Sequence, residues 1–226
     1  MERWTSIVDE DVQKKTFSII NRLYNTNPNR YMPAYKDILK VFKITPYNYI
    51  KVVMLFMDPY STPNTATGIP LANKKDTKIL SPSLKVLKES VINFEIPHNC
   101  CTFDPTLEEW SKQGILLLNS ALTVEVGKPG SHLYIWRDFI KSFLYNFSMY
   151  NPGIIYVLWG NTAKSFKNYI NSPAEILTVP HPAFFARNNS KIPYCIFTKI
   201  NELCVKHFDE PINWYNELNL ETNENY

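Results

Sequence analysis

The stretch that decides the fold is Val52-Val53-Met54-Leu55-Phe56-Met57-Asp58-Pro59-Tyr60-Ser61. Five apolar residues in a row, followed by a short polar and proline-containing segment, are typical of a strand buried on both faces of a parallel sheet. Three further runs have the same form, and each also ends in polar, glycine or proline residues: Ile115–Leu118 before Asn119-Ser120, Ile154–Trp159 before Gly160-Asn161-Thr162, and Glu175–Val179 before Pro180-His181-Pro182. We therefore expect four strands.

Helical patterns separate these runs. Pro82 fits the first turn of a helix, and a second helix is predicted where apolar residues recur at i, i+3, i+4 and i+7. The alternation of strands and helices predicts one α/β domain over residues 1–226, with a central four-stranded, mostly parallel sheet and helices on both faces. The tail, residues 216–226, is expected to fray. The second helix is marked by Trp136, Phe139, Ile140, Phe143, Leu144 and Phe147, and others are expected over residues 9–24, 104–114, 162–171 and 196–203.

Composition excludes several classes of protein. The chain has 226 residues, of which 45% are hydrophobic and 20% charged, as in a globular domain. No stretch of ~18 apolar residues is long enough to span a membrane. The net charge of +3 is too small to identify a nucleic-acid binder by itself. The N-terminus lacks the features of a signal peptide, so we expect an intracellular protein, in the nucleus or cytoplasm.

The cysteines give no sign of a metal site. Cys100, Cys101, Cys195 and Cys204 form no C-x-x-C pair, and His98 beside two adjacent cysteines is a poor tetrahedral site. We expect reduced thiols, no metal and no cofactor.

Three polar residues follow three different strands. In open α/β sheets the ligand binds beyond the carboxyl ends of the strands, so Asp58, Asn119 and His181 are expected to converge on one crevice. Each is a weak signal alone. An Asp or Asn after a strand is often only a turn residue or a helix cap, and a single His is more often structural. Their common position at strand ends favours a shared site.

Several motifs, in order from about Tyr31 to Trp214, resemble family 1 uracil-DNA glycosylases. Met57–Ser61 with Thr67–Pro70 is similar to the family's water-activating loop, and Pro82-Ser83-Leu84 to its proline-rich loop. Trp110–Val124 is very close to its uracil-recognition strand. The remaining matches are Leu158–Gly160 with the glycine–serine loop, His181-Pro182 with the start of the DNA-intercalation loop, and the closing segments Phe197–Leu203 and Pro211–Trp214.

The resemblance implies a role for each site residue. Asp58 would orient water and stabilise positive charge on the sugar, and His181 would donate a hydrogen bond to the departing base. Asn119 would bind the uracil edge, and Tyr60 would exclude a thymine methyl group. Met57 and Leu71 would complete the uracil site. DNA contacts would come from Ser61, Pro82, Ser83, Gly160, Asn161, Phe184, Phe185 and Arg187, with Lys74, Lys75, Lys128 and Lys164 as further candidates for phosphate contact.

The sequence also departs from the family pattern. Phe56 and Met57 replace a Gly and a Gln, Ser61 replaces a His, and Leu71 stands where a Phe would stack on uracil. The wedge residue, usually Leu, falls at Phe184 or Phe185, and both rings are expected to be exposed. Some of these departures resemble poxvirus-type members, so we expect a divergent member from a large DNA virus, located in the nucleus or cytoplasm of the host cell.

The resemblance predicts uracil-DNA glycosylase activity in base excision repair. Its substrate would be uracil-containing single- and double-stranded DNA, and possible partners would be replication proteins and uracil-glycosylase inhibitor proteins. An alternative is a DNA-binding replication accessory, or processivity, factor with this fold and weak or absent catalysis. A small-molecule nucleoside hydrolase is less favoured, because Phe184-Phe185 would then have no base stack to enter.

Overall fold

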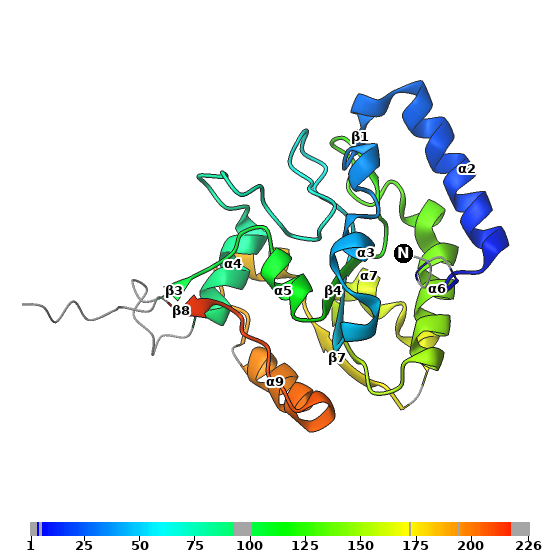
Figure 1. Cartoon of the computed structure of the whole chain (residues 1–226). Coiled ribbons are helices and arrows are strands. Elements are labelled where there is room, and N and C mark those ends of the chain that lie inside the picture. The colour runs from blue at the N-terminus through cyan, green and yellow to red at the C-terminus, as the bar shows by residue number, and fades with distance from the viewer. Residues whose placement is uncertain (1–3, 5, 93–100, 172, 194, 218–226) are drawn as a thin grey trace, which may run out of the picture.

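The structure, a computed structural model, describes residues 4, 6–92, 101–171, 173–193 and 195–217 (Figure 1). Its centre is a four-stranded parallel sheet in the order β4-β2-β6-β7. The strands are β2 (Val52–Phe56), β4 (Ile115–Asn119), β6 (Ile155–Trp159) and β7 (Glu175–Val179). The prediction of four strands in a mostly parallel sheet is confirmed.

Burial differs among the four strands. Every residue of β2, β4 and β6 is buried, as continuous apolar runs require. The strand β7 lies at the sheet edge and differs: Val179 is buried, but Thr178 is exposed. The expectation that all four strands are buried on both faces is therefore wrong for β7. Its first residue, Glu175, instead forms an ion pair with Lys206 at 3.2 Å.

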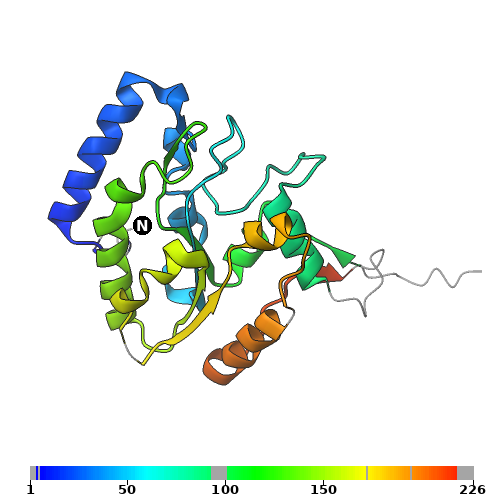
Figure 2. The same cartoon turned by 180° about the vertical axis from the view of Figure 1, so that it is seen from behind.

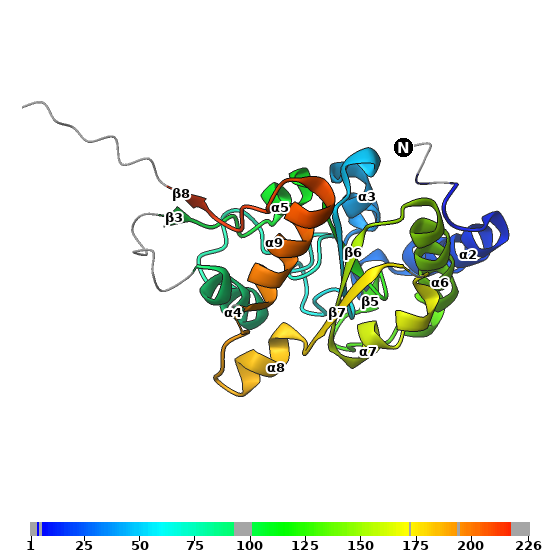
Figure 3. The same ribbon diagram turned by 90° about the horizontal axis from the view of Figure 1, so that it is seen from below.

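Helices cover both faces of the sheet. Figure 3 shows α2, α6 and α7 on one side and α4, α8 and α9 on the other, and Figure 2 shows α2 lying along α6. The α-helices are α2 (Glu10–Thr26), α3 (Lys40–Ile44), α4 (Pro82–Val91), α5 (Glu108–Lys112), α6 (Leu133–Tyr150), α7 (Gly160–Lys164), α8 (Pro182–Arg187) and α9 (Cys195–Phe208). Single 3₁₀ turns lie at Pro28–Arg30, Tyr35–Asp37, Tyr47–Tyr49 and Lys167–Tyr169.

The helix α6 confirms the clearest helical pattern in the sequence. All six of its predicted apolar positions are buried, and Phe143 stacks on Phe147 with ring centroids 5.3 Å apart. The helices α2, α4 and α9 also form where they were expected, and Pro82 occupies the first turn of α4.

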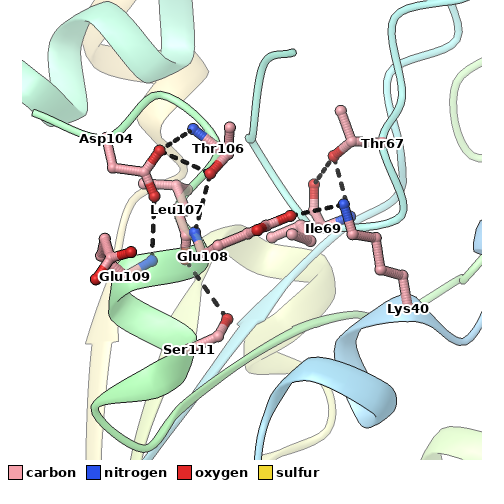
Figure 4. Close-up of polar contacts among 9 residues, drawn as sticks. All are labelled: Lys40, Thr67, Ile69, Asp104, Thr106, Leu107, Glu108, Glu109 and Ser111. Atoms are coloured by element: carbon pink, nitrogen blue, oxygen red, sulfur yellow. Dashed lines mark hydrogen bonds and ion pairs between the residues drawn. The ribbon is translucent and has the colours of Figure 1, made fainter. Parts of the chain in front are cut away.

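Three predicted boundaries are wrong. The helix expected over 104–114 begins only at Glu108, because the Asp104 carboxylate accepts the backbone N–H groups of Thr106 and Glu109, at 2.9 and 3.1 Å, and so caps the helix from upstream. Figure 4 shows these contacts. The helix expected over 162–171 divides into α7 and a separate 3₁₀ turn. Residues 182–187, predicted as part of the DNA-intercalation loop, form a helix, α8.

Two short antiparallel pairs complete the fold. One joins β1 (Tyr31–Met32) to β5 (Val124–Glu125), and the other joins β3 (Cys101–Thr102) to β8 (Asn216–Glu217). The expected frayed tail therefore does not start at residue 216, while residues 218–226 lie outside the described residues, as do His98 and Cys100. Among the described residues, no group of three or more His, Cys, Asp and Glu side chains could hold a metal ion. None of the described helices combines the length and the apolarity needed to cross a bilayer.

Candidate functional site at the carboxyl ends of the strands

Phe56, the last residue of β2, connects the three polar residues predicted to converge. Asn119 lies opposite Phe56 in the β2–β4 register. The ring of His181, just beyond β7, meets the Phe56 ring edge-on, with centroids 6.1 Å apart. Asp58 is two residues further along the chain. The structure thus gathers Asp58, Asn119 and His181 at one edge of the sheet, as the parallel topology predicts.

Asp58 is held by the backbone of a neighbouring turn. The N–H of Gly130 donates to Asp58 Oδ2 at 2.5 Å. Burial raises the pKa of the Asp58 carboxyl, and the Gly130 hydrogen bond lowers it by less. Gly130 has a φ of +80°, and a Cβ there would come within 3.2 Å of the Met57 methyl group. Sequence reasoning missed Gly130, although the Pro129-Gly130 pair is a recognisable turn signal.

A narrow pocket lies beside Asp58. Tyr60, Leu71 and Asn119 line it together with apolar neighbours, but Asp58 and His181 are not among its lining residues. The Tyr60 hydroxyl donates to the Leu71 carbonyl at 2.9 Å and lies 2.5 Å from the Ser81 hydroxyl. Burial raises the pKa of Tyr60 to about 12, so its phenol is neutral. These contacts fix the Tyr60 ring as a wall of the pocket. The full lining is Ile38, Val41, Pro59, Tyr60, Ala66, Gly68, Ile69, Pro70, Leu71, Leu117, Asn119 and Leu122.

Asn119 presents an unpaired hydrogen-bond acceptor in the pocket. Its side-chain oxygen is buried and has no hydrogen-bond partner among the described residues. Leaving a buried acceptor unpaired costs ~1–3 kcal/mol, so buried acceptors are nearly always hydrogen-bonded in the functional state. In a pocket, that partner is a donor on a ligand, such as the N–H of a base or an amide.

His181 is the N-cap of α8, and this fixes its tautomer. Its Nδ1 accepts the backbone N–H of Ala183 at 3.1 Å, so the neutral ring carries its proton on Nε2. Burial, and to a smaller extent the charge of Arg187, lower the His181 pKa to about 4. At neutral pH the ring is an uncharged donor. Gly160 leaves room for it, since a Cβ at Gly160 would lie 2.9 Å from the His181 Cβ.

The two adjacent aromatics of α8 have different environments. Phe184 is 48% exposed, whereas Phe185 is 7% exposed and belongs to the core. Successive residues of a helix point about 100° apart, so one ring turns outward and the other inward. The expectation that both rings are exposed is wrong for Phe185. The helix α8 packs against α4, so Phe184 and Pro82 belong to neighbouring helices.

The other residues predicted to contact DNA differ in their exposure to solvent. Pro82, Asn161 and Arg187 are exposed, and Ser61 is partly exposed, with its carbonyl bonded to the N–H of Gly127 at 2.9 Å. Ser83 is buried, so its side chain has little surface to offer DNA. Among the predicted phosphate contacts, Lys74, Lys75 and Lys164 are exposed, but Lys128 forms an ion pair with Glu125 at 2.8 Å.

Comparison with known proteins decides the family. The model of the uracil DNA glycosylase superfamily matches residues 42–204. The chain belongs to the uracil-DNA glycosylase superfamily. A uracil-DNA glycosylase of Campylobacter lari is 33% identical over 225 residues, which span 97% of this chain and 95% of the relative. One from Coxiella burnetii is 34% identical over 221 residues and covers 94% of both chains.

Solved structures show the same fold for this superfamily member. The crystal structure of mimivirus uracil-DNA glycosylase superposes with a TM-score of 0.73 at 20% sequence identity, covering 93% of this chain and 88% of that one. A structure from Nitratifractor salsuginis gives a TM-score of 0.60 at 19% identity. The predicted α/β fold of a uracil-DNA glycosylase is confirmed.

Proposed function

We propose that this chain is a uracil-DNA glycosylase that hydrolyses the N-glycosidic bond of uracil flipped out of DNA and leaves an abasic site for base excision repair. The observation that supports this most directly is the buried, unpaired oxygen of Asn119 in the pocket walled by Tyr60. The similarity of the chain to uracil-DNA glycosylases over nearly its full length supports the same reaction.

Asp58 acts on the sugar. Breaking a glycosidic bond builds positive charge on the sugar ring, and a nearby carboxylate stabilises that charge. The Gly130 N–H holds Oδ2, which leaves Oδ1 available to orient the attacking water. Burial leaves the negative charge of Asp58 weakly solvated, which raises the pKa of its carboxyl and strengthens the attraction of the carboxylate to a cation in the site.

Asn119 and Tyr60 select the base. The free oxygen of Asn119 matches the N3–H of uracil, while cytosine presents a bare nitrogen at the same position. The Tyr60 ring, fixed by Leu71 and Ser81, occupies the space that a 5-methyl group would need. Leu71 and Met57 complete the apolar surroundings of the base.

His181 stabilises the leaving base. As the bond breaks, negative charge grows on uracil O2, and the Nε2–H of the neutral imidazole is the donor that meets it. A neutral donor suits this role because it keeps its proton throughout the reaction. The rigid Pro180-His181-Pro182 backbone and the cap to Ala183 aim the ring.

Phe184 replaces the flipped base in the stack. Its exposed position on α8 lets the ring enter DNA and offset part of the few kcal/mol of unstacking. Phosphates of the DNA strand would be bound by Ser61, Asn161, Arg187 and the backbone N–H of Gly160, and Pro82 would contact the strand by packing. The buried Phe185 supports α8 from inside.

Proteins that bind the face around Phe184 are further proposed partners. Mimivirus uracil-DNA glycosylase variants have been crystallised in complex with UGI, and these complexes have TM-scores of 0.73 to this chain. We propose that an inhibitor of that kind can also cover the face around Phe184. Partnership with replication proteins, a nuclear or cytoplasmic location and a viral origin remain predictions from the sequence.

Uracil release from a single-stranded oligonucleotide with one uracil tests the proposed reaction. The purified protein should release free uracil and leave a strand that alkali cleaves at that position. Tight DNA binding without uracil release would instead support the accessory-factor alternative.

A further inference from the structure

Phe56 lies where the strands that carry the site residues meet. Its backbone carbonyl accepts two hydrogen bonds from Ser120, from the N–H at 2.9 Å and from the hydroxyl at 2.7 Å. These bonds tie the end of β2 to the chain just beyond β4. On the other side, the β2–β6 register pairs Leu55 with Leu158. The next residues, Phe56 and Trp159, lie side by side, and their rings stack with centroids 5.8 Å apart and planes 9° apart.

Two more rings extend this stack in opposite directions. Trp159 meets Phe197 of α9, with ring centroids 6.5 Å apart. Phe56 meets the His181 ring at an interplanar angle of 86°, with centroids 6.1 Å apart. Phe197, Trp159 and Phe56 are each at most 1% exposed. A continuous row of rings thus runs from α9, on the face of the sheet that α4, α8 and α9 cover (Figure 3), to the proposed hydrogen-bond donor.

The His181 ring needs a second support besides its helix cap. The Ala183 N–H holds Nδ1, but one hydrogen bond tolerates a wide range of angles and leaves the ring free to tilt about that contact. Gly160 lies against the His181 Cβ and not against the ring. The edge-on contact with Phe56 restricts the remaining tilt, because paired rings prefer a defined geometry. The direction of the Nε2–H therefore depends on Phe56.

Phe56 also distinguishes this chain from the family pattern described above, which has a Gly at this position. A glycine has no ring and cannot make the contact with His181. Phe56 is not among the residues that line the pocket beside Asp58, so it does not act on the base directly. Its ring faces the donor from below, and its influence on the reaction must pass through the orientation of His181.

We propose that Phe56 is a positioning residue, which orients the His181 ring so that its Nε2–H points at the departing base. This role rests on the proposed glycosylase function and deepens it. A displacement of about 1 Å in a group that acts on the reacting atoms can cost ~10²-fold in rate. A residue that only supports the ring can therefore have a large effect on turnover.

A double-mutant cycle tests whether Phe56 acts through His181. The proteins are the unmodified chain, Phe56→Leu, His181→Asn and the double variant, and each is measured by single-turnover release of uracil from one single-stranded oligonucleotide. Leu keeps the position apolar and removes the ring. The matched control is Phe143→Leu on α6, because Phe143 is also 1% exposed and stacked on a neighbouring ring, but on the opposite face of the sheet (Figure 3). Unfolding midpoints and DNA affinities are measured for every variant.

Phe56→Leu should lower the single-turnover rate by about 10- to 100-fold and keep the DNA affinity. In the His181→Asn background, the same substitution should change the rate by less than about twofold, because no donor is left to position. Phe143→Leu should lower the unfolding midpoint to a similar extent and keep the rate. Phe56→Met, which fills the space without a ring, should reproduce the effects of Phe56→Leu and serves in its place if the Leu variant does not fold.

Two results would overturn the positioning role. One is a folded Phe56→Leu or Phe56→Met protein with a rate within about threefold of the original. The other is an equal fold-loss in the presence and absence of His181, which would mean that Phe56 supports the site independently of that ring. In both cases the unmodified protein still releases uracil, whereas failure of the proposed function would abolish release by the unmodified protein.

Discussion

His181→Asn separates the structural role of His181 from its chemical role. His181 caps α8 by accepting the Ala183 N–H on Nδ1, and an Asn oxygen makes the same cap in many helices. The shorter Asn side chain cannot at once cap the helix and place an N–H where Nε2 lies. His181→Ala, by contrast, removes the cap as well and should cost ~1 kcal/mol of stability. The Asn variant therefore removes the donor and keeps the helix.

The structure sets the expected size of the effect. With a pKa of about 4, His181 is almost fully neutral at pH 7, so all of its contribution is that of one neutral donor. Removing one positioned donor to a developing anion costs ~10²–10³ in kcat, or ~3–4 kcal/mol. Because the ring stays neutral, kcat of the unmodified protein should also be flat between about pH 6 and 8, without the step near 6.5 of an ordinary His.

The assay is single-turnover release of uracil from a single-stranded oligonucleotide, with thermal unfolding and DNA affinity as controls. His181→Asn should unfold within a few degrees of the unmodified protein, bind DNA normally and lose two to three orders of magnitude in rate. A folded His181→Asn protein within about threefold of the original rate would refute the donor role. A step in kcat near pH 6.5 that disappears in this variant would refute the neutral ring.

The remaining predictions concern base choice, the wedge and acid pH. Asn119→Asp should release some cytosine and Tyr60→Ala some thymine, measured on matched oligonucleotides. If both variants lose uracil release and neither releases the second base, the base pocket lies elsewhere. Phe184→Ala should slow excision from duplex DNA much more than excision from single strands, and equal losses on both DNA forms would show that Phe184 is not the wedge. Phe185→Ala should instead lower the free energy of unfolding by ~3–5 kcal/mol, measured by denaturant unfolding. Because burial raises the Asp58 pKa above 3.8, the acid limb of kcat should have its midpoint above that value, and a midpoint at or below it would contradict the assignment.

The sequence predicts the frame of this protein well because periodicity reports burial. Strands such as Val52–Phe56 and the helix around Phe143 carry patterns that have few other solutions, and parallel topology then places Asp58 and Asn119 at one edge. It could not predict what depends on tertiary contacts. Both β4 and β7 are edge strands, but β4 is fully buried whereas Thr178 of β7 is exposed, and only the packed structure shows this difference.

The chemistry of the site shows the same division. The identities of Asp58 and His181 are readable from strand ends and from motifs, but their hydrogen-bond partners are not. The Gly130 N–H that holds Asp58 comes from a turn 72 residues away in the sequence. Phe184 and Phe185 differ in exposure because residues 182–187 form the helix α8. This helix is too short for its apolar periodicity to be recognised in the sequence.

Asp58→Asn tests most directly whether the carboxylate just beyond β2 drives uracil excision. The substitution keeps the size of the side chain and removes the negative charge that stabilises the sugar cation. Uracil release by the two proteins is compared in single turnover on the same single-stranded oligonucleotide, together with their DNA affinity. We predict that release falls by orders of magnitude while DNA affinity is kept. A well-folded Asp58→Asn protein that excises uracil at the original rate would contradict this role of the carboxylate.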